Sequence, residues 1–379
     1  MKRELDRLSR RSAIGLLGVS GLGLVSSWTE GFDAEAAWQA GASTAKPLAG
    51  VPPGAIIRTV LRDVPPQAVG PGATVFHDHL VMRLQMRGRP APITTPPVDE
   101  VVRVLQQDVK EGLSCVVDGS CLDMGRDIGA LKQIAKRVPG LHVVSCGGYY
   151  TQPSYPDDIS KKSEDQLADE IARDAVQNGV GAFGEIGTST EITPDERKVL
   201  RAVGKAHVRT GVPIFTHNAV YPPNQHALAM KAAMGQLDLF EAVGVDLRTV
   251  IIGHLCCHDE RNVEVPKAVA KRGAFVGFDR ITLESTVSDE TRVKLAMAFL
   301  DAGYADKLVL AADFYGDERA SGHPGGKVRS VNGRPPGWAR TATVFGPMLR
   351  KAGVPAATVS QILNDNPRRF LAFVPKKGS

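Results

Sequence analysis

Six residues of this 379-residue chain are of types that commonly bind metal ions, and each stands where a short apolar run ends. His77 and His79 are separated by one residue, so on a strand, where successive side chains point to opposite faces, both would face the same side. Imidazole and carboxylate ligands without a thiolate suit zinc, manganese, cobalt or iron. The remaining four residues of this set are Glu185, His217, His254 and Asp313.

The apolar runs that carry these residues predict eight β-strands. Their starts lie 24 to 41 residues apart, which is room for one strand, one helix and two loops. This alternation predicts an α/β fold, a closed (β/α)8 TIM barrel, with an open doubly wound sheet as the structural alternative. The predicted strands are Ala73–His79, Ser114–Asp118, Leu141–Ser145, Ala182–Glu185, Pro213–His217, Val250–His254, Ala274–Phe278 and Leu308–Asp313.

Capping residues predict where helices begin between the strands. Thr193 precedes Pro194 and stands three residues before Glu196, the spacing of a capping box with proline at the first helical position. Ser163 and Ser288 precede acidic residues and are expected to cap the helices before the fourth and eighth strands.

Enzymes of the barrel class build their active sites at the carboxyl ends of the strands, which is where all six candidate ligands would lie. Any one of them alone is more often a hydrogen-bonded core or capping residue, so their joint placement carries the prediction of a metal site. We expect two divalent ions, zinc first among the suitable metals, with Glu185 and a hydroxide bridging them at about 3.5–4 Å. The other ligands would be His77, His79 and Asp313 on one ion and His217 and His254 on the other.

Several short motifs follow one another between about residues 55 and 374. They are Gly72–Leu80 (GATVFHDHL), Asp118–Asp127 (DGS…GRD), Gly147–Tyr150 (GGYY), Gly184–Ser189 (GEIGTS), Gly277–Arg280 (GFDR) and Asn366–Phe370 (NPRRF). Each is weak alone, but the ordered set resembles the phosphotriesterase family of the amidohydrolase superfamily. The resemblance implies a (β/α)8 hydrolase with a binuclear metal centre, and it carries the ligand roles onto the same six residues.

The resemblance also bears on the substrate. Well-known members of the family bridge their metals with a carboxylated lysine on the fourth strand, whereas this chain has Glu185 there, as in the phosphotriesterase-related branch. Arg280 stands where lactonase-like members often have arginine. We therefore expect hydrolysis of a small-molecule lactone or carboxylic or aryl ester by the bridging hydroxide, with at most weak activity on phosphotriesters.

Three residues have expected roles in that reaction. Asp313 would act as both metal ligand and catalytic acid/base, accepting the proton of the hydroxide and delivering it to the leaving group. Tyr149, at the end of the third strand, is expected to line the substrate pocket. Arg280 would orient the substrate or pair with Asp279 or Asp313.

Two other functions fit the same ligands. One is a TatD-like metal-dependent nuclease, whose family combines the same types of metal ligand on the same barrel. The other is a non-catalytic periplasmic barrel that binds a metal ion or a ligand. The GGYY, GFDR and NPRRF motifs, together with the predicted export, favour the phosphotriesterase resemblance over the nuclease. The intact set of six ligands argues against a non-catalytic barrel.

Residues 1–36 have the features of an export signal. Arg10 and Arg11 precede the apolar stretch Ala13–Val25, and Ala34-Glu35-Ala36 offers a cleavage site. This pattern resembles a twin-arginine signal, with an ordinary Sec signal or a basic tail as alternatives, and predicts a periplasmic or extracellular protein. We expect a linker at 37–54, the hydrolase domain at 55–374 and a short tail at 375–379.

The composition excludes several classes of protein. With 43% hydrophobic and 23% charged residues, the chain is neither disordered, nor collagen-like, nor a polytopic membrane protein. The net charge of +5 arises from 46 basic and 41 acidic residues and gives little support to nucleic-acid binding. We expect no nucleic-acid partner and no stable membrane insertion. The sequence is compatible with a homodimer.

Overall fold

The computed structural model describes residues 48–189, 191–218, 225–257, 263–281, 287–316, 333 and 337–376. The predicted export signal lies outside these ranges, as do most of the predicted linker and the last three residues of the predicted tail. Within the described ranges, no helix has the length and apolar character that crossing a membrane requires.

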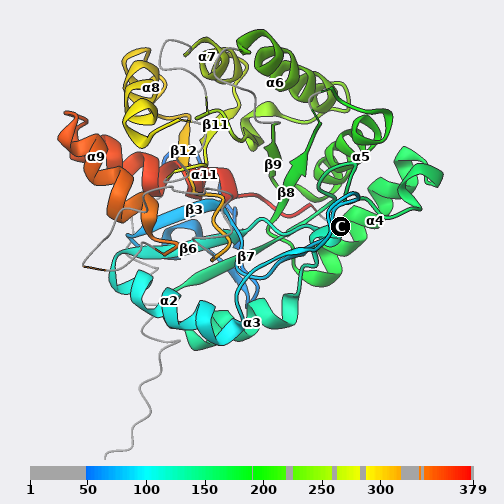
Figure 1. The fold of residues 1–379 in the computed structure, drawn as a ribbon, viewed down its shortest axis with the longest axis horizontal. Coiled ribbons are helices and arrows are strands. Elements are labelled where there is room, and N and C mark those ends of the chain that lie inside the picture. Colours follow the sequence, from blue (N-terminus) through cyan, green and yellow to red (C-terminus); the bar gives the residue numbers. More distant parts are fainter. Residues whose placement is uncertain are drawn as a thin grey trace, which may run out of the picture. The chain divides into compact units, whose positions relative to one another are not determined.

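Eight parallel strands form one sheet in which consecutive strands are neighbours, and helices connect them (Figure 1). This is the predicted (β/α)8 barrel, and each strand begins within one residue of its predicted start. The strands are β3 (Ala73–Asp78), β6 (Leu113–Asp118), β7 (His142–Gly147), β8 (Ala182–Gly187), β9 (Ile214–His217), β10 (Val250–Ile252), β11 (Phe275–Phe278) and β12 (Leu308–Leu310).

The barrel closes where the first strand meets the segment that follows the last. The Asp313 backbone N–H donates to the carbonyl oxygen of His77 at 3.1 Å, and the His79 N–H donates to the carbonyl of Phe314 at 2.8 Å. The side chain of Asp78 accepts the Phe314 N–H at 2.8 Å. Asp78 therefore ties this seam together while the histidines on either side of it face the barrel axis.

The helices begin where the capping residues predict. Ser163 and Thr193 each form a complete capping box, Pro194 occupies the first turn, and Ser288 accepts the Thr291 N–H. The helices that connect the strands are α2 (Val98–Lys110), α3 (Ile128–Arg137), α4 (Glu164–Asn178), α5 (Pro194–Thr210), α6 (His226–Glu241), α7 (Glu264–Lys271) and α8 (Asp289–Asp301). The C-terminal helices are α9 (Gly346–Lys351), α10 (Ala356–Ser360) and α11 (Asn366–Leu371).

Two small antiparallel hairpins were not predicted. They pair β1 (Ile57–Arg58) with β2 (Asp63–Val64), and β4 (Arg83–Leu84) with β5 (Ile93–Thr94). Strands of two residues are too short to show an alternation of apolar and polar side chains, so the sequence carries no signal for them.

Aromatic side chains fill the barrel beneath the strand ends. Phe76 of β3 and Phe215 of β9 meet edge to face at 5.9 Å, although these strands are not neighbours in the sheet, so the contact spans the interior. Gly277 makes this possible, because a Cβ there would lie 2.8 Å from the Phe76 ring. Truncating a buried phenylalanine to alanine typically costs about 3–5 kcal/mol, so this layer supports the residues above it.

Candidate metal centre

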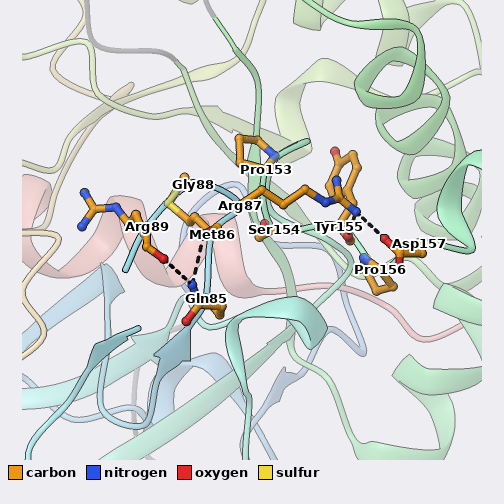
Figure 2. Close-up of a pocket in the computed structure, with 10 residues that line it drawn as sticks. All are labelled: Gln85, Met86, Arg87, Gly88, Arg89, Pro153, Ser154, Tyr155, Pro156 and Asp157. Atoms are coloured by element: carbon orange, nitrogen blue, oxygen red, sulfur yellow. Dashed lines mark hydrogen bonds and ion pairs between the residues drawn. The ribbon is translucent and has the colours of Figure 1, made fainter. Parts of the chain in front are cut away.

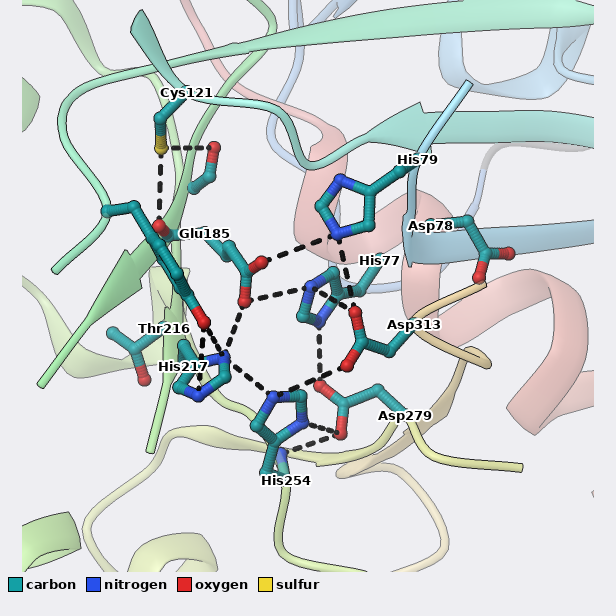
Figure 3. A network of polar contacts seen from close by, with 12 residues as sticks. His77, Asp78, His79, Cys121, Glu185, Thr216, His217, His254, Asp279 and Asp313 are labelled. Carbon is teal, nitrogen blue, oxygen red and sulfur yellow. Dashed lines mark hydrogen bonds and ion pairs between the residues drawn. The ribbon is translucent and has the colours of Figure 1, made fainter. Parts of the chain in front are cut away.

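All six candidate ligands converge at the carboxyl ends of the barrel strands (Figure 3). Three lie in strands, at the fifth position of β3, the fourth of β8 and the last of β9. The other three follow β3, β10 and β12 by one, two and three residues. In that order they are His77, Glu185, His217, His79, His254 and Asp313.

One group of donor atoms gathers around the end of β3. The Nε2 atom of His79 lies 3.3 Å from Glu185 Oε1 and 3.3 Å from Asp313 Oδ1. The Nε2 atom of His77 lies 3.1 Å from Glu185 Oε2 and 3.7 Å from Asp313 Oδ1. The four residues offer ligand atoms that all lie within 4.8 Å of one another, a spacing that could hold a metal ion.

A second group shares Glu185 with the first. Its Oε2 lies 2.7 Å from His217 Nδ1, and His254 Nε2 lies 2.8 Å from the same nitrogen. These three residues form another set whose ligand atoms are within 4.8 Å. Glu185 is thus common to both of these groups, and a third set, formed by His77, His254 and Asp279, overlaps them.

One carboxylate forms hydrogen bonds with two of the histidines, on the side of each ring that faces away from the centre. The Nδ1 atoms of His77 and His254 each lie 2.9 Å from an oxygen of Asp279, which is itself completely buried. Because an ionised carboxylate only accepts hydrogen bonds, both Nδ1 atoms carry a proton, and Nε2 is the ring atom through which each histidine would bind a metal ion. The Nε2 of His77 has no well-aligned hydrogen-bond partner among the described residues.

His79 is oriented by a different chain of hydrogen bonds. The Ser120 hydroxyl donates to Asp118 Oδ1 at 2.7 Å, so its oxygen accepts from His79 Nδ1 at 3.1 Å. The Nε2 of His79 is then free to bind a metal, as in the carboxylate–histidine pairs that support metal sites in other proteins. The donor set, its burial and the protonation that its neighbours impose all fit divalent metal ions.

The buried charges shift the pKa values of the centre's members. Burial alone would raise the pKa of Glu185, but His77 and His217 outweigh it and hold this pKa well below its usual value. Burial would lower the pKa of His79, yet the two nearest carboxylates raise it to about 9. Burial and the neighbouring His254 lower the pKa of His217 to about 4. Without metal, protons therefore occupy the first group, and metal ions would displace them.

The two ligands that follow β10 and β12 have an uncommon backbone conformation. His254 has φ of 59° and Asp313 has φ of 54°, the left-handed region that residues other than glycine seldom adopt. The predicted strands ending at these residues were therefore too long, because the backbone leaves the extended conformation before it reaches them. Such conformations gather at functional sites, where the surrounding structure stabilises them.

Comparisons with known proteins agree with this site. The sequence profile of the phosphotriesterase family matches residues 57–371. This chain belongs to the phosphotriesterase family. It is 29% identical over 309 residues to the phosphotriesterase homology protein of Escherichia coli K12, covering 79% of this chain and 97% of that protein.

Two further members are similar over most of their length. N-acetyltaurine hydrolase of Danio rerio is 25% identical over 363 residues, covering 84% of this chain and 98% of that protein. The crystal structure of a resiniferatoxin-binding protein from Rhodobacter sphaeroides superposes with a TM-score of 0.69 at 28% identity, covering 85% of this chain and 96% of the other. The phosphotriesterase-family assignment thus rests on sequence and on structure.

In this phosphotriesterase-family chain, Tyr150 rather than Tyr149 reaches the centre. The Tyr149 hydroxyl donates to Glu170, whereas the Tyr150 hydroxyl lies 3.2 Å from His217 Nδ1. Gly148, with φ of 96°, interrupts the alternation of side chains after β7, so counting along the strand selects the wrong tyrosine for this position.

Arg280 does reach the centre. Its Nη2 donates to Asp313 Oδ2 at 3.1 Å, which decides between the two partners expected from the sequence. Burial would lower its pKa, but Asp313 and other nearby groups raise it, so the guanidinium stays charged. Its Nε is buried without a hydrogen-bond partner among the described residues.

Sequence reasoning gave no role at this site to Asp279, Ser120 and Tyr150. Asp279 directly follows β11 and Ser120 follows β6 by two residues, so the rule that selected the ligands, a polar residue at a strand end, also applies to them. What the sequence lacks is the direction of each side chain, which separates residues that face the centre from those that support it.

A second cavity of about 350 Å³ lies away from these residues (Figure 2). It is lined by the β4–β5 hairpin and the loop after β7, which Arg87 joins by donating to the carbonyl oxygens of Gln152 and Tyr155 and to the carboxylate of Asp157. None of the six candidate ligands lines it, so it does not belong to the metal centre of this family member.

Proposed function

We propose that this protein is a hydrolase with a binuclear metal centre, in which Glu185 bridges the two groups of ligands described above. The position of Glu185 carries the proposal. Its carboxylate oxygens lie within 3.3 Å of one nitrogen from each of His77, His79 and His217, and the chain belongs to the phosphotriesterase family. Zinc is the metal we propose first, since imidazole and carboxylate ligands suit it.

Two divalent ions bound there would lower the pKa of a water molecule toward about 7 and supply hydroxide at neutral pH. Asp313 is placed to hold and move a proton, because Oδ1 faces His79 and Oδ2 faces His254 and Arg280. Its carboxylate thus reaches both halves of the centre, and it can pass a proton to the leaving group.

Substrate would approach where the centre is least covered. The side chains of Arg280, Asp313 and His217 are 20%, 14% and 13% exposed, whereas those of the other candidate ligands are at most 3% exposed. Among the described residues, Arg280 and Tyr150 are two polar groups in contact with these side chains that do not belong to the ligand set. We assign to them the orientation of the substrate's carbonyl group.

A lactone or a carboxylic or aryl ester is the substrate class that we propose. Arg280 supports it, because its guanidinium donates to Asp313 beside the centre and has further N–H groups that could hold a polar oxygen there. An N-acyl amide is the second candidate, because a relative aligned over 84% of this chain is named N-acetyltaurine hydrolase. Both classes present a carbonyl carbon to the same attacking group.

The test is a screen of metal-free and reconstituted protein. Chelator-treated protein, before and after addition of zinc or manganese, is assayed on lactones, aryl esters, N-acyl amides and phosphotriesters. We expect turnover only after reconstitution, and faster on lactones or aryl esters than on phosphotriesters. Turnover that persists after complete metal removal would refute the proposal.

The same preparations test the two other functions. Metal-dependent DNA cleavage with a salt-sensitive affinity would favour a TatD-like nuclease, because phosphate contacts release counterions. Stoichiometric metal binding without turnover of any substrate would favour a binding barrel.

Asp313 provides a test of the reaction itself. We expect Asp313→Asn to retain much of the bound metal, since an amide oxygen still coordinates, but to lower kcat by about 10²–10⁴-fold, the range typical of losing a general acid or base. Metal content and kcat are measured on the same sample. An unchanged kcat would remove the proton-transfer role.

A further inference from the structure

Asp279 is the residue that touches both halves of the candidate centre. It follows β11 directly, and its side chain is fully buried between His77 and His254 (Figure 3). Oδ2 accepts from His77 Nδ1 at 2.9 Å, while Oδ1 accepts from His254 Nδ1 at 2.9 Å and from the His254 backbone N–H at 2.6 Å. His77 belongs to the group around β3 and His254 to the group with His217, and together with Asp279 these two histidines form a third set whose ligand atoms lie within 4.8 Å of one another.

The surroundings are shaped for this carboxylate. At Gly253 a Cβ would lie 2.6 Å from Asp279 Oδ2 and 2.3 Å from the carbonyl oxygen of Thr216, so only glycine leaves room for the side chain. Both oxygens are used, and both partners are donors. Asp279 therefore has a fixed position and a fixed hydrogen-bonding pattern.

We propose that Asp279 is a positioning residue that sets the tautomer of one histidine in each half of the centre, so that both metal positions are available together. The proposal rests on the proposed binuclear centre. A histidine that carries its proton on Nδ1 presents the Nε2 lone pair to the metal, whereas the other neutral tautomer presents an N–H, which cannot coordinate.

Asparagine in place of Asp279 is expected to affect the two halves of the centre differently. Its amide has one accepting oxygen and one donating nitrogen. The oxygen stays toward His254, because two donors, the backbone N–H and Nδ1–H, meet there. The amide NH₂ then faces His77 Nδ1, which must become the acceptor, so the proton moves to His77 Nε2 and blocks the ion that would bind with His79 and Asp313.

The experiment is metal loading of full-length wild type, Asp279→Asn and Ser120→Ala. Ser120→Ala is the matched control, because it removes the acceptor behind His79, a ligand of the same ion, without introducing a donor. Each protein is dialysed against the same manganese concentration, the one that saturates wild type. Bound manganese is measured by mass spectrometry and located by anomalous diffraction.

We expect two ions per chain in wild type and Ser120→Ala, and one in Asp279→Asn, located between His217 and His254. Two ions in Asp279→Asn, or a single ion on the His77 side, would overturn the inference. If wild type itself binds no manganese or zinc, the binuclear centre fails instead, so the two failures are distinguishable.

A measurement on wild type keeps the inference testable if Asp279→Asn does not fold. In the zinc-loaded protein labelled with ¹⁵N-histidine, NMR correlations show which ring nitrogen carries a proton. We expect protonated Nδ1 on His77 and His254. A proton on Nε2 of either residue would overturn the inference.

Discussion

Raising the pH is expected to destabilise the metal-free protein and to stabilise the metal-loaded one. A group whose pKa is higher in the folded protein than in the unfolded chain stabilises the fold fully below its unfolded pKa, and this stabilisation is lost as the pH rises through the folded value. For His79 the pKa rises from 6.5 to about 9, because the nearby carboxylates outweigh burial. For Asp78, burial raises the pKa from 3.8 to about 7.

These two shifts set the size of the effect. Between pH 6.5 and 8, His79 and Asp78 together lose on the order of 2 kcal/mol of stabilisation. The pKa of His77 is also raised, because Glu185 and Asp279 outweigh burial, and this adds to the loss. Burial lowers the pKa values of His142, His207 and His217, which opposes the trend.

A loss of about 2 kcal/mol corresponds to a fall in Tm of roughly 3 °C for a domain of about 320 residues, given an unfolding entropy of about 2.1 cal/mol/K per residue. Bound metal reverses the direction in which a rise in pH changes the stability. Metal ions bind only deprotonated ligands, so their affinity and their contribution to stability rise with pH.

The assay is thermal unfolding at four pH values from 6.5 to 8 and constant ionic strength, with excess chelator or excess manganese. In chelator, His79→Asn should show less than half the wild-type slope of Tm against pH. A Tm that is constant or rises with pH in chelator, or that moves in the same direction with and without metal, would contradict the reasoning.

Three further predictions concern residues around the centre and the export signal. Tyr150→Phe is expected to raise KM or lower kcat by about tenfold, because the Tyr150 hydroxyl faces the centre. Tyr149→Phe is expected to change Tm but not the kinetics, because the Tyr149 hydroxyl donates to Glu170 instead. Arg280→Met should raise KM for esters by about 10–100-fold with both ions retained, and an unaltered KM would remove its substrate role. Replacing Arg10 and Arg11 together by lysine should leave the protein in the cytoplasm, as fractionation would show, and continued export would exclude a twin-arginine signal.

The fold could be predicted from the sequence. Strand starts follow from apolar runs, and helix starts from capping residues such as Thr193, because both signals are local. Once the strands form a barrel, residues at their carboxyl ends are necessarily close together. His77 and His79 share a face by alternation alone.

What the sequence did not predict depends on conformation beyond the strand ends. The left-handed backbone at Asp313 and the positive φ of Gly148 redirect the chain, so the alternation rule no longer gives the direction of side chains such as Tyr149 and Tyr150. Asp279 supports His77, which is 202 positions away in the chain, and His254, which is 25 positions away. No local pattern encodes such a contact.

The seam between β3 and the segment after β12 has a consequence for how the protein matures. His77 and Asp313 come from the two sides of that seam, so their side chains meet only when the first and last strands of the barrel are joined. An ion held by both residues would link the first strand of the barrel to the last. This is the one place in the barrel where neighbouring strands are distant in the chain. Metal capture would thus be a late event in assembly, and a loaded ion would mark a barrel that has already closed.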